Sequence, residues 1–447
     1  MQPEDESNET SDPITLAREA VIHTWPLYEM RRARASTSYP TLPGLGAAEE
    51  GKHWCNVFAH RRALIRPGVS KIVMPNNDTL YSVAWLDLGQ GPVVIDVPDM
   101  KGRYHVLGLL DQLTNPFAHI GSRLSGSGPH SVLVSGPDWN REIPDAFAAP
   151  GMHLRSPPRW VWIIGRILVL GADDLPNVHS LQDGLRIRPH EGSNAPGQFR
   201  PDCDPDQPLD AAHFIGQVNA ALQECQGSKA VDWTRIEAFA QLGIGPGLRA
   251  SANQLQQLEP VIREVRTLLQ VPRAMRSAAN WEHLPTIGTS FGEDLLLRAH
   301  VSQQYIGMVE GREAIYPLTW RDESGNLLSG DCDYKLSFEP DGLPPVDAFW
   351  SLTIYESETG WLVDNPIDRY AIGDRTPGLV RDPAGRLRIR ISHAPPQKED
   401  EVNWLPAPKE TFYLCLRAYL PHAELLDGRY QLPPVRRLVH DVAQSRS

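Results

Sequence analysis

The chain has 447 residues, of which 41% are hydrophobic and 22% charged, so we expect packed cores in two or three domains rather than disorder. Its 40 prolines and 35 glycines argue against a helical bundle and favour short strands joined by many turns. The formal net charge of −12 repels phosphate backbones, which argues against nucleic acid as a partner.

The cysteines and the apolar runs bear on the compartment. The cysteines show no CxxC spacing and an odd total, which fits neither a disulfide framework nor a zinc site: Cys55, Cys203, Cys225, Cys332 and Cys415. The acidic N-terminus does not resemble a signal peptide, and the longest apolar run, residues 160–170, is too short to span a bilayer. We therefore expect a cytoplasmic protein with reduced thiols and no membrane partner.

In chain order, residues 1–62 read as a tail and a helical region. Asp12 and Pro13 predict the start of a helix, and Trp25-Pro26 predicts a bend in it. Residues 63–171 then show short apolar or alternating runs that predict strands at 72–74, 80–86, 92–97, 104–110, 131–134, 160–165 and 167–170. Strands at this spacing indicate a β-sandwich, although their pairing order stays open.

The second half of the chain predicts a helical middle region and a second β domain. Between 172 and 310 the hydrophobic period becomes helical, with helices expected at 175–185, 210–226, 233–241, 253–269 and 291–307. From 311 to 440 strands return, at 335–338, 348–354, 387–391 and 412–418. The predicted fold class is therefore mixed and mainly β, with helical segments.

The familiar catalytic and cofactor motifs are absent from the sequence. There is no P-loop, no strand–GxGxxG–helix unit, no GxSxG elbow and no HExxH pair, so we expect no organic cofactor. His105 and Asp111 would share one face of a strand, and with His119 they could supply a two-histidine, one-carboxylate metal site. Histidines in clefts are more often hydrogen-bonded than bound to metal, so no metal is assigned.

Longer segments point to a family. They include PNNDTLYS at 75–82, DQLTNPF at 111–117, PPVDAFWSLT at 344–353, NPIDRY at 365–370 and NWLPAP at 403–408. Together they resemble the tandem family of domains of unknown function 1254 (N-terminal) and 1214 (C-terminal). The resemblance implies an immunoglobulin-like sandwich, a helical region and a jelly-roll-like sandwich. It implies no activity.

Polar residues inside these segments are the candidate site. The run at 76–79 has four turn-forming residues where one suffices, so the remaining groups could face a ligand or could satisfy the loop backbone. Asp111 ends an apolar strand and Arg123 follows in the next loop, which fits either a buried ion pair or a site. His105 and His119 would suit acid–base work near neutral pH. Trp404 is expected in the core or in a cleft wall.

The leading hypothesis is a cofactor-independent enzyme that acts on a small organic molecule by acid–base chemistry (hydrolysis, elimination or isomerisation) in a cleft between two β domains. The candidate proton-transfer groups are Asp78, Tyr81, His105 and Asp111. The candidate substrate contacts are Asn76, Asn77, Thr114, Asn115, His119, Arg123, Arg369, Tyr370 and Trp404.

Two alternatives stay open: a non-catalytic protein that binds carbohydrate or another small molecule, and a metal-dependent enzyme with His and Asp ligands. The oligomeric state is also open, a homo-oligomer included. If the leading hypothesis holds, Asp78 or Tyr81 should meet the Asp111–Arg123 loop directly or through one water. The C-terminal domain should close the pocket with Arg369, Tyr370 or Trp404.

Overall fold

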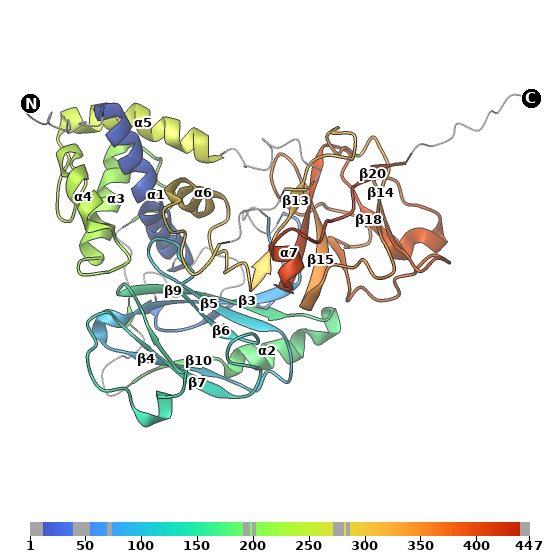
Figure 1. Cartoon of the computed structure of the whole chain (residues 1–447), viewed down its shortest axis with the longest axis horizontal. Coiled ribbons are helices and arrows are strands. Elements are labelled where there is room, and N and C mark those ends of the chain that lie inside the picture. The colour runs from blue at the N-terminus through green and yellow to red at the C-terminus, as the bar shows by residue number, and fades with distance from the viewer. Residues whose placement is uncertain are drawn as a thin grey trace, which may run out of the picture.

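The computed structural model describes residues 12–38, 54–68, 74–190, 197–198, 203–270, 281–282 and 287–438. Figure 1 shows a helical unit, a β unit below it and a second β unit beside them. The fold class is mixed and mainly β with helical segments, as the sequence predicted. Among the described residues, no helix has the length and apolar character needed to cross a membrane.

The first β unit consists of two sheets packed face to face. The five-stranded antiparallel sheet contains β2 (Ala59–His60), β3 (Thr79–Asp87), β9 (Trp160–Leu168), β5 (His105–Leu110) and β6 (Ala118–Gly121), in that order. The four-stranded sheet contains β10 (Arg186–Pro189), β4 (Val93–Val97), β7 (His130–Ser135) and β8 (His153–Arg155), with β7 and β8 parallel. A short ladder pairs β1 (Trp54–Cys55) with β11 (Gly197–Gln198). Helix α2 (Leu175–Gly184) precedes β10.

The central strands β3 and β9 are buried on both faces, which explains their nearly continuous apolar sequences. On β3, Leu80 and Leu86 face the core between the two sheets, whereas Val83 faces away from it. On β9, Ile163 faces that core and Ile164 faces away from it. The outer face of the five-stranded sheet therefore lies against the rest of the molecule, and it carries the site described below.

The helical unit is built around α1 (Pro13–Ser38), which contacts four described helices of the middle region. These are α3 (Ala211–Glu224), α4 (Trp233–Phe239), α5 (Ala252–Gln270) and α6 (Leu295–Gln304). Trp25, Tyr28 and Phe214 are buried in its core. Helix α1 continues through Pro26 to residue 38, because the buried side chains around the proline hold the helix together despite the missing N–H donor.

The second β unit also has two sheets with a shared apolar core. One contains β12 (Ala314–Ile315), β19 (Phe412–Pro421), β15 (Val346–Glu356) and β16 (Ala371–Gly373), and β13 (Leu318–Thr319) also pairs with β19. The other contains β18 (Trp404–Pro406), β17 (Leu387–Ser392), β14 (Tyr334–Phe338) and β20 (Arg436–Arg437). Helix α7 (Ala423–Leu426) follows β19. The immunoglobulin-like and jelly-roll-like topologies remain predictions.

Two boundaries differ from those predicted. Strand β9 is continuous where two strands were expected, because Gly165 lets the neighbouring backbone approach: a Cβ there would lie 2.7 Å from the Ser82 carbonyl oxygen. The first β unit extends to residue 189 instead of ending at 171, since β10 pairs with β4 and Val178 of α2 joins the core. The predicted tail at 1–11 lies outside the described residues, as does most of the predicted strand at 72–74.

Candidate functional site

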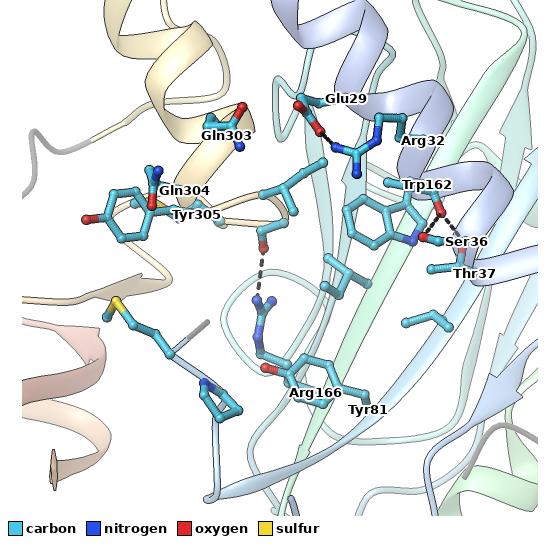
Figure 2. A pocket seen from close by; sticks show the side chains of 18 of the residues that line it. Glu29, Arg32, Ser36, Thr37, Tyr81, Trp162, Arg166, Gln303, Gln304 and Tyr305 are labelled. Carbon is cyan, nitrogen blue, oxygen red and sulfur yellow. Dashed lines mark hydrogen bonds and ion pairs between the residues drawn. The ribbon is translucent and has the colours of Figure 1, made fainter. Parts of the chain in front are cut away.

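A cavity of about 520 Å³ lies where the helical unit and the two β units meet. Its walls come from α1, from the outer face of β3 and β9, from the segment that follows α6, and from β19. The middle of the cavity is apolar, with Val83, Ile164 and Met308 among its lining residues. Figure 2 shows Arg166 and Tyr81 on one side of this space, and Glu29 and Arg32 on the opposite side. The volume suits a small organic molecule.

Two buried arginines line the cavity without a carboxylate partner. Arg166 on β9 is 6% exposed, and its Nη2 donates to the Gly307 carbonyl oxygen at 2.9 Å, while Nη1 has no partner among the described residues. Arg417 on β19 is 5% exposed, and its Nη2 donates to the Met74 carbonyl oxygen at 2.8 Å and to the Tyr355 hydroxyl at 2.6 Å. In the part of the chain that the structure describes, its Nε has no partner. Buried guanidinium groups are normally paired with an anion. Within the described part of the chain, neither arginine has one.

Tyrosines surround these two arginines. The Arg166 Cζ lies 5.5 Å from the centroid of the Tyr81 ring, and the Arg417 Cζ lies 5.5 Å from that of Tyr316. Both tyrosines line the cavity, and neither hydroxyl donates to another described residue. Burial raises the pKa of Tyr316, so this phenol is neutral at physiological pH and supplies no counter-charge. This end of the cavity therefore offers positive charge and hydroxyl donors.

At the opposite end of the cavity, positive and negative charges are paired. Arg32 donates to Glu29 at 2.9 Å, and burial raises the pKa of the Glu29 carboxyl. The Arg32 side chain is 37% exposed, so this end is the nearer to solvent. The indole of Trp162 forms an apolar wall here and stacks on Trp85 at 5.6 Å between ring centroids.

Of the four residues predicted to transfer protons, only Tyr81 lines the cavity. Asp78 instead ties the two β units together: its carboxylate accepts from the Ser351 hydroxyl at 2.6 Å and from Arg375 Nη2 at 2.9 Å. Asn76 donates to the Tyr419 hydroxyl at 2.7 Å, also across this interface. The buried Oδ1 of Asn77 meets no hydrogen-bond donor from the described residues. The polar run at 76–79 thus joins the two β units.

Asp111 stabilises its own loop through hydrogen bonds. Its carboxylate accepts from the backbone N–H groups of Leu113 at 2.8 Å and Asn115 at 3.0 Å, and from the Asn115 side-chain amide at 2.8 Å. Burial raises the pKa of this carboxyl. Thr114 sits within the same turn at a φ of 66°. The expected Asp111–Arg123 group does not form, because these hydrogen bonds satisfy Asp111 locally and Arg123 binds other carboxylates.

Arg123 and the two histidines form a separate polar region. Arg123 donates to Glu313 at 2.7 Å and to Glu310 at 2.8 Å. The Nε2 of His119 accepts from the backbone N–H of Glu310 at 3.3 Å, and the His105 ring lies 3.2 Å from the Ser122 hydroxyl. Burial lowers the pKa of both histidines to about 4, so both are neutral near pH 7. Neither lines the cavity.

The predicted C-terminal contacts lie inside the second β unit. Arg369 donates to three backbone carbonyls, including that of Trp404 at 2.9 Å. The Tyr370 hydroxyl donates to Asp368 at 2.7 Å, and burial raises its pKa to about 12. Trp404 is 1% exposed. The second β unit does close the cavity, but it does so with Tyr316 and Arg417.

The sequence interpretation missed the arginines of the cavity. The available signal was a charged residue inside an otherwise apolar strand: Arg166 interrupts WVWIIGRIL, and Arg417 interrupts FYLCLRAYLP. The hypothesis of a metal-dependent enzyme finds no set of ligands. The described residues include no group of three or more His, Cys, Asp or Glu side chains that could hold a metal ion. All five cysteines are free thiols.

Comparisons with known proteins concern the fold. Residues 55–189 match the family described as "Protein of unknown function (DUF1254)", and residues 313–423 match "Protein of unknown function (DUF1214)". The crystal structure of the VPA0106 protein from Vibrio parahaemolyticus is similar, with a TM-score of 0.68 and 24% identity over 95% of this chain and 100% of that one. An uncharacterised protein from Burkholderia cenocepacia gives a TM-score of 0.45 and 14% identity over 97% of this chain and 91% of its own. No curated protein matches the chain.

Proposed function

The chain belongs to the tandem DUF1254–DUF1214 family. We propose that it binds a small organic acid in the cavity between its three units. One observation carries the proposal: Arg166 and Arg417 are buried against the cavity and no carboxylate of the described residues pairs with either. A carboxylate ligand would supply the missing negative charge, and charge-assisted hydrogen bonds to guanidinium groups are among the stronger ones in proteins.

The rest of the cavity favours an apolar body for this acid. Its apolar lining residues include Val83, Trp162, Ile164, Ile306 and Met308. Burying an apolar ligand against such side chains is favourable by about 25 cal/mol per Å². A ligand with a carboxylate at one end and an aliphatic or aromatic body would therefore match both parts of the cavity.

The test is a calorimetric titration with paired ligands that differ only in the acid group. Hexanoate and benzoate would be compared with hexanol and benzyl alcohol. We expect each acid to bind at least about tenfold more tightly than its alcohol, and Arg166→Gln or Arg417→Gln to remove that advantage. Arg429→Gln is a matched control, because it removes one positive charge from an exposed turn. Equal binding of acids and alcohols, or unchanged binding by both cavity variants, would contradict the proposal.

Catalysis on the bound acid is a second candidate function, and it is favoured by Glu29. This carboxyl lines the cavity, and burial raises its pKa, so it is a candidate for accepting or donating a proton there. Tyr81 offers a free hydroxyl on the other side. Proton exchange at carbon would appear as deuterium incorporation into a bound acid in D₂O. Glu29→Gln should stop that exchange while acid binding persists.

The binding alternative for carbohydrate has less support. Sugars commonly stack on exposed aromatic rings, but Trp350 and Trp404 in the second β unit are 2% and 1% exposed. Neither ring can form the floor of a surface groove.

A further inference from the structure

A third arginine lines the same cavity. Arg61 follows β2, is 8% exposed, and forms no ion pair or side-chain hydrogen bond with any described residue. Its backbone N–H donates to the Tyr81 carbonyl oxygen at 2.9 Å, which fixes it beside β3. The burial that lowers the pKa of Arg61 reflects the cost of holding this charge away from water.

The register of the sheet places Arg61 at a defined separation from Arg166. His60 pairs with Ser82, so Arg61 stands opposite Tyr81, and Tyr81 in turn pairs with Arg166. Residues opposite one another on neighbouring strands point to the same face. Arg61, Tyr81 and Arg166 therefore form one row across the sheet, with the two arginines about 10 Å apart at their Cα atoms, or two strand spacings.

The charges that line the cavity do not balance. Its charged residues are four arginines and two carboxylates: Arg32, Arg61, Arg166, Arg417, Glu29 and Asp206. Arg32 and Glu29 pair with each other. Asp206 is exposed to solvent. The described lining thus has an excess of two positive charges, and a monocarboxylate would neutralise only one of them.

We propose that the natural ligand of this cavity is a dicarboxylic acid, with one acid group held by Arg166 and Arg417 and the other by Arg61. This inference rests on the proposed function and sharpens it. Tyr81 stands between Arg61 and Arg166 in this row, and its ring centroid lies 5.5 Å from the Arg166 Cζ. A phosphate monoester also has two negative charges, but both lie on one group. The two arginines of the row, Arg61 and Arg166, are instead about 10 Å apart at their Cα atoms.

The test compares dicarboxylates with their own monoamides, which keep the length and remove one charge. Succinate, glutarate and adipate would be titrated against the three monoamides with wild-type protein, Arg61→Gln, Arg61→Lys and the exposed control Arg429→Gln. We expect at least one dicarboxylate to bind about tenfold more tightly than its monoamide. Arg61→Gln should lose that advantage and keep monoamide binding within about twofold, and Arg61→Lys should retain most of it.

The outcomes separate this inference from the proposed function. If monoamides and dicarboxylates bind the wild type equally, or if Arg61→Gln weakens both equally, the dicarboxylate inference is wrong although acid binding stands. Tighter binding of glycerol 3-phosphate than of every dicarboxylate would also overturn it. If no carboxylate binds at all, both proposals fail. Circular dichroism and thermal unfolding of each variant show whether Arg61→Gln is folded, and Arg61→Met, which also removes the charge, provides the same comparison if it is not.

Discussion

An unpaired buried arginine should make the ligand-free protein less stable than it could be, and Arg166→Met tests this directly. Arg166 is only 6% exposed, and its guanidinium has no carboxylate partner among the described residues. Holding such a charge away from water costs several kcal/mol, roughly 5 here. Its hydrogen bond to the Gly307 carbonyl oxygen stabilises the folded protein by about 2 kcal/mol, and its contact with the Tyr81 ring by about 1 kcal/mol. The net cost of the buried charge is then about 2 kcal/mol. Methionine has a similar length and fills the space without the charge.

The expected result is that Arg166→Met increases the free energy of unfolding by about 2 kcal/mol, while acid binding is lost. Thermal unfolding by calorimetry, with and without benzoate, measures both effects. Arg103→Met is the matched control, because Arg103 donates to Asp174 at 2.8 Å in a pair whose side chains are 14% and 12% exposed. Breaking that pair should destabilise the protein by about 3 kcal/mol. If Arg166→Met is as damaging as Arg103→Met, Arg166 is a structural cation and the argument for a missing anion fails.

Three further predictions concern the regions around the cavity. Arg123→Gln should destabilise the protein by about 3 kcal/mol in urea unfolding near pH 8, because it leaves Glu310 and Glu313 buried without their shared cation. Burial raises the pKa of Glu313, so this loss of stability should be smaller near pH 5. An equal loss at both pH values would contradict this account. Burial lowers the pKa of His105 and His119 from 6.5 to about 4, so between these pH values the unfolded state binds protons that the folded state does not. The free energy of unfolding should therefore fall by up to about 3 kcal/mol for each histidine as the pH drops from 6.5 to about 4. His119→Gln should flatten that decline, and an unchanged pH profile would show that His119 is not one of its causes.

Much of the fold could be predicted from local sequence patterns. The helix expected at 210–226 is observed as α3, and Asp210 caps it by accepting from the His213 N–H at 2.7 Å. Alternating or apolar runs located β3, β5 and β15 to within one or two residues. These elements are determined by side chains that are close in sequence, so the pattern alone is sufficient.

The boundaries and the site depend on contacts that no local pattern contains. The polar run at 76–79 was a reasonable candidate for ligand contact, yet its partners are Ser351, Arg375 and Tyr419 from the other end of the chain. Likewise, Arg166 and Arg417 come together only when β9 and β19 pack across the interface between the β units. Each arginine alone reads as an irregularity in an apolar strand.

The most direct test of acid binding is a crystal structure of the protein soaked with 4-bromobenzoate, whose bromine can be located by anomalous scattering. The account predicts bromine in the cavity near Ile164 and Trp162, with the carboxylate within about 3.2 Å of a guanidinium nitrogen of Arg166 or Arg417. An empty cavity at saturating ligand, or a carboxylate pointing toward Glu29 and Gln303 with both arginines uncontacted, would contradict it.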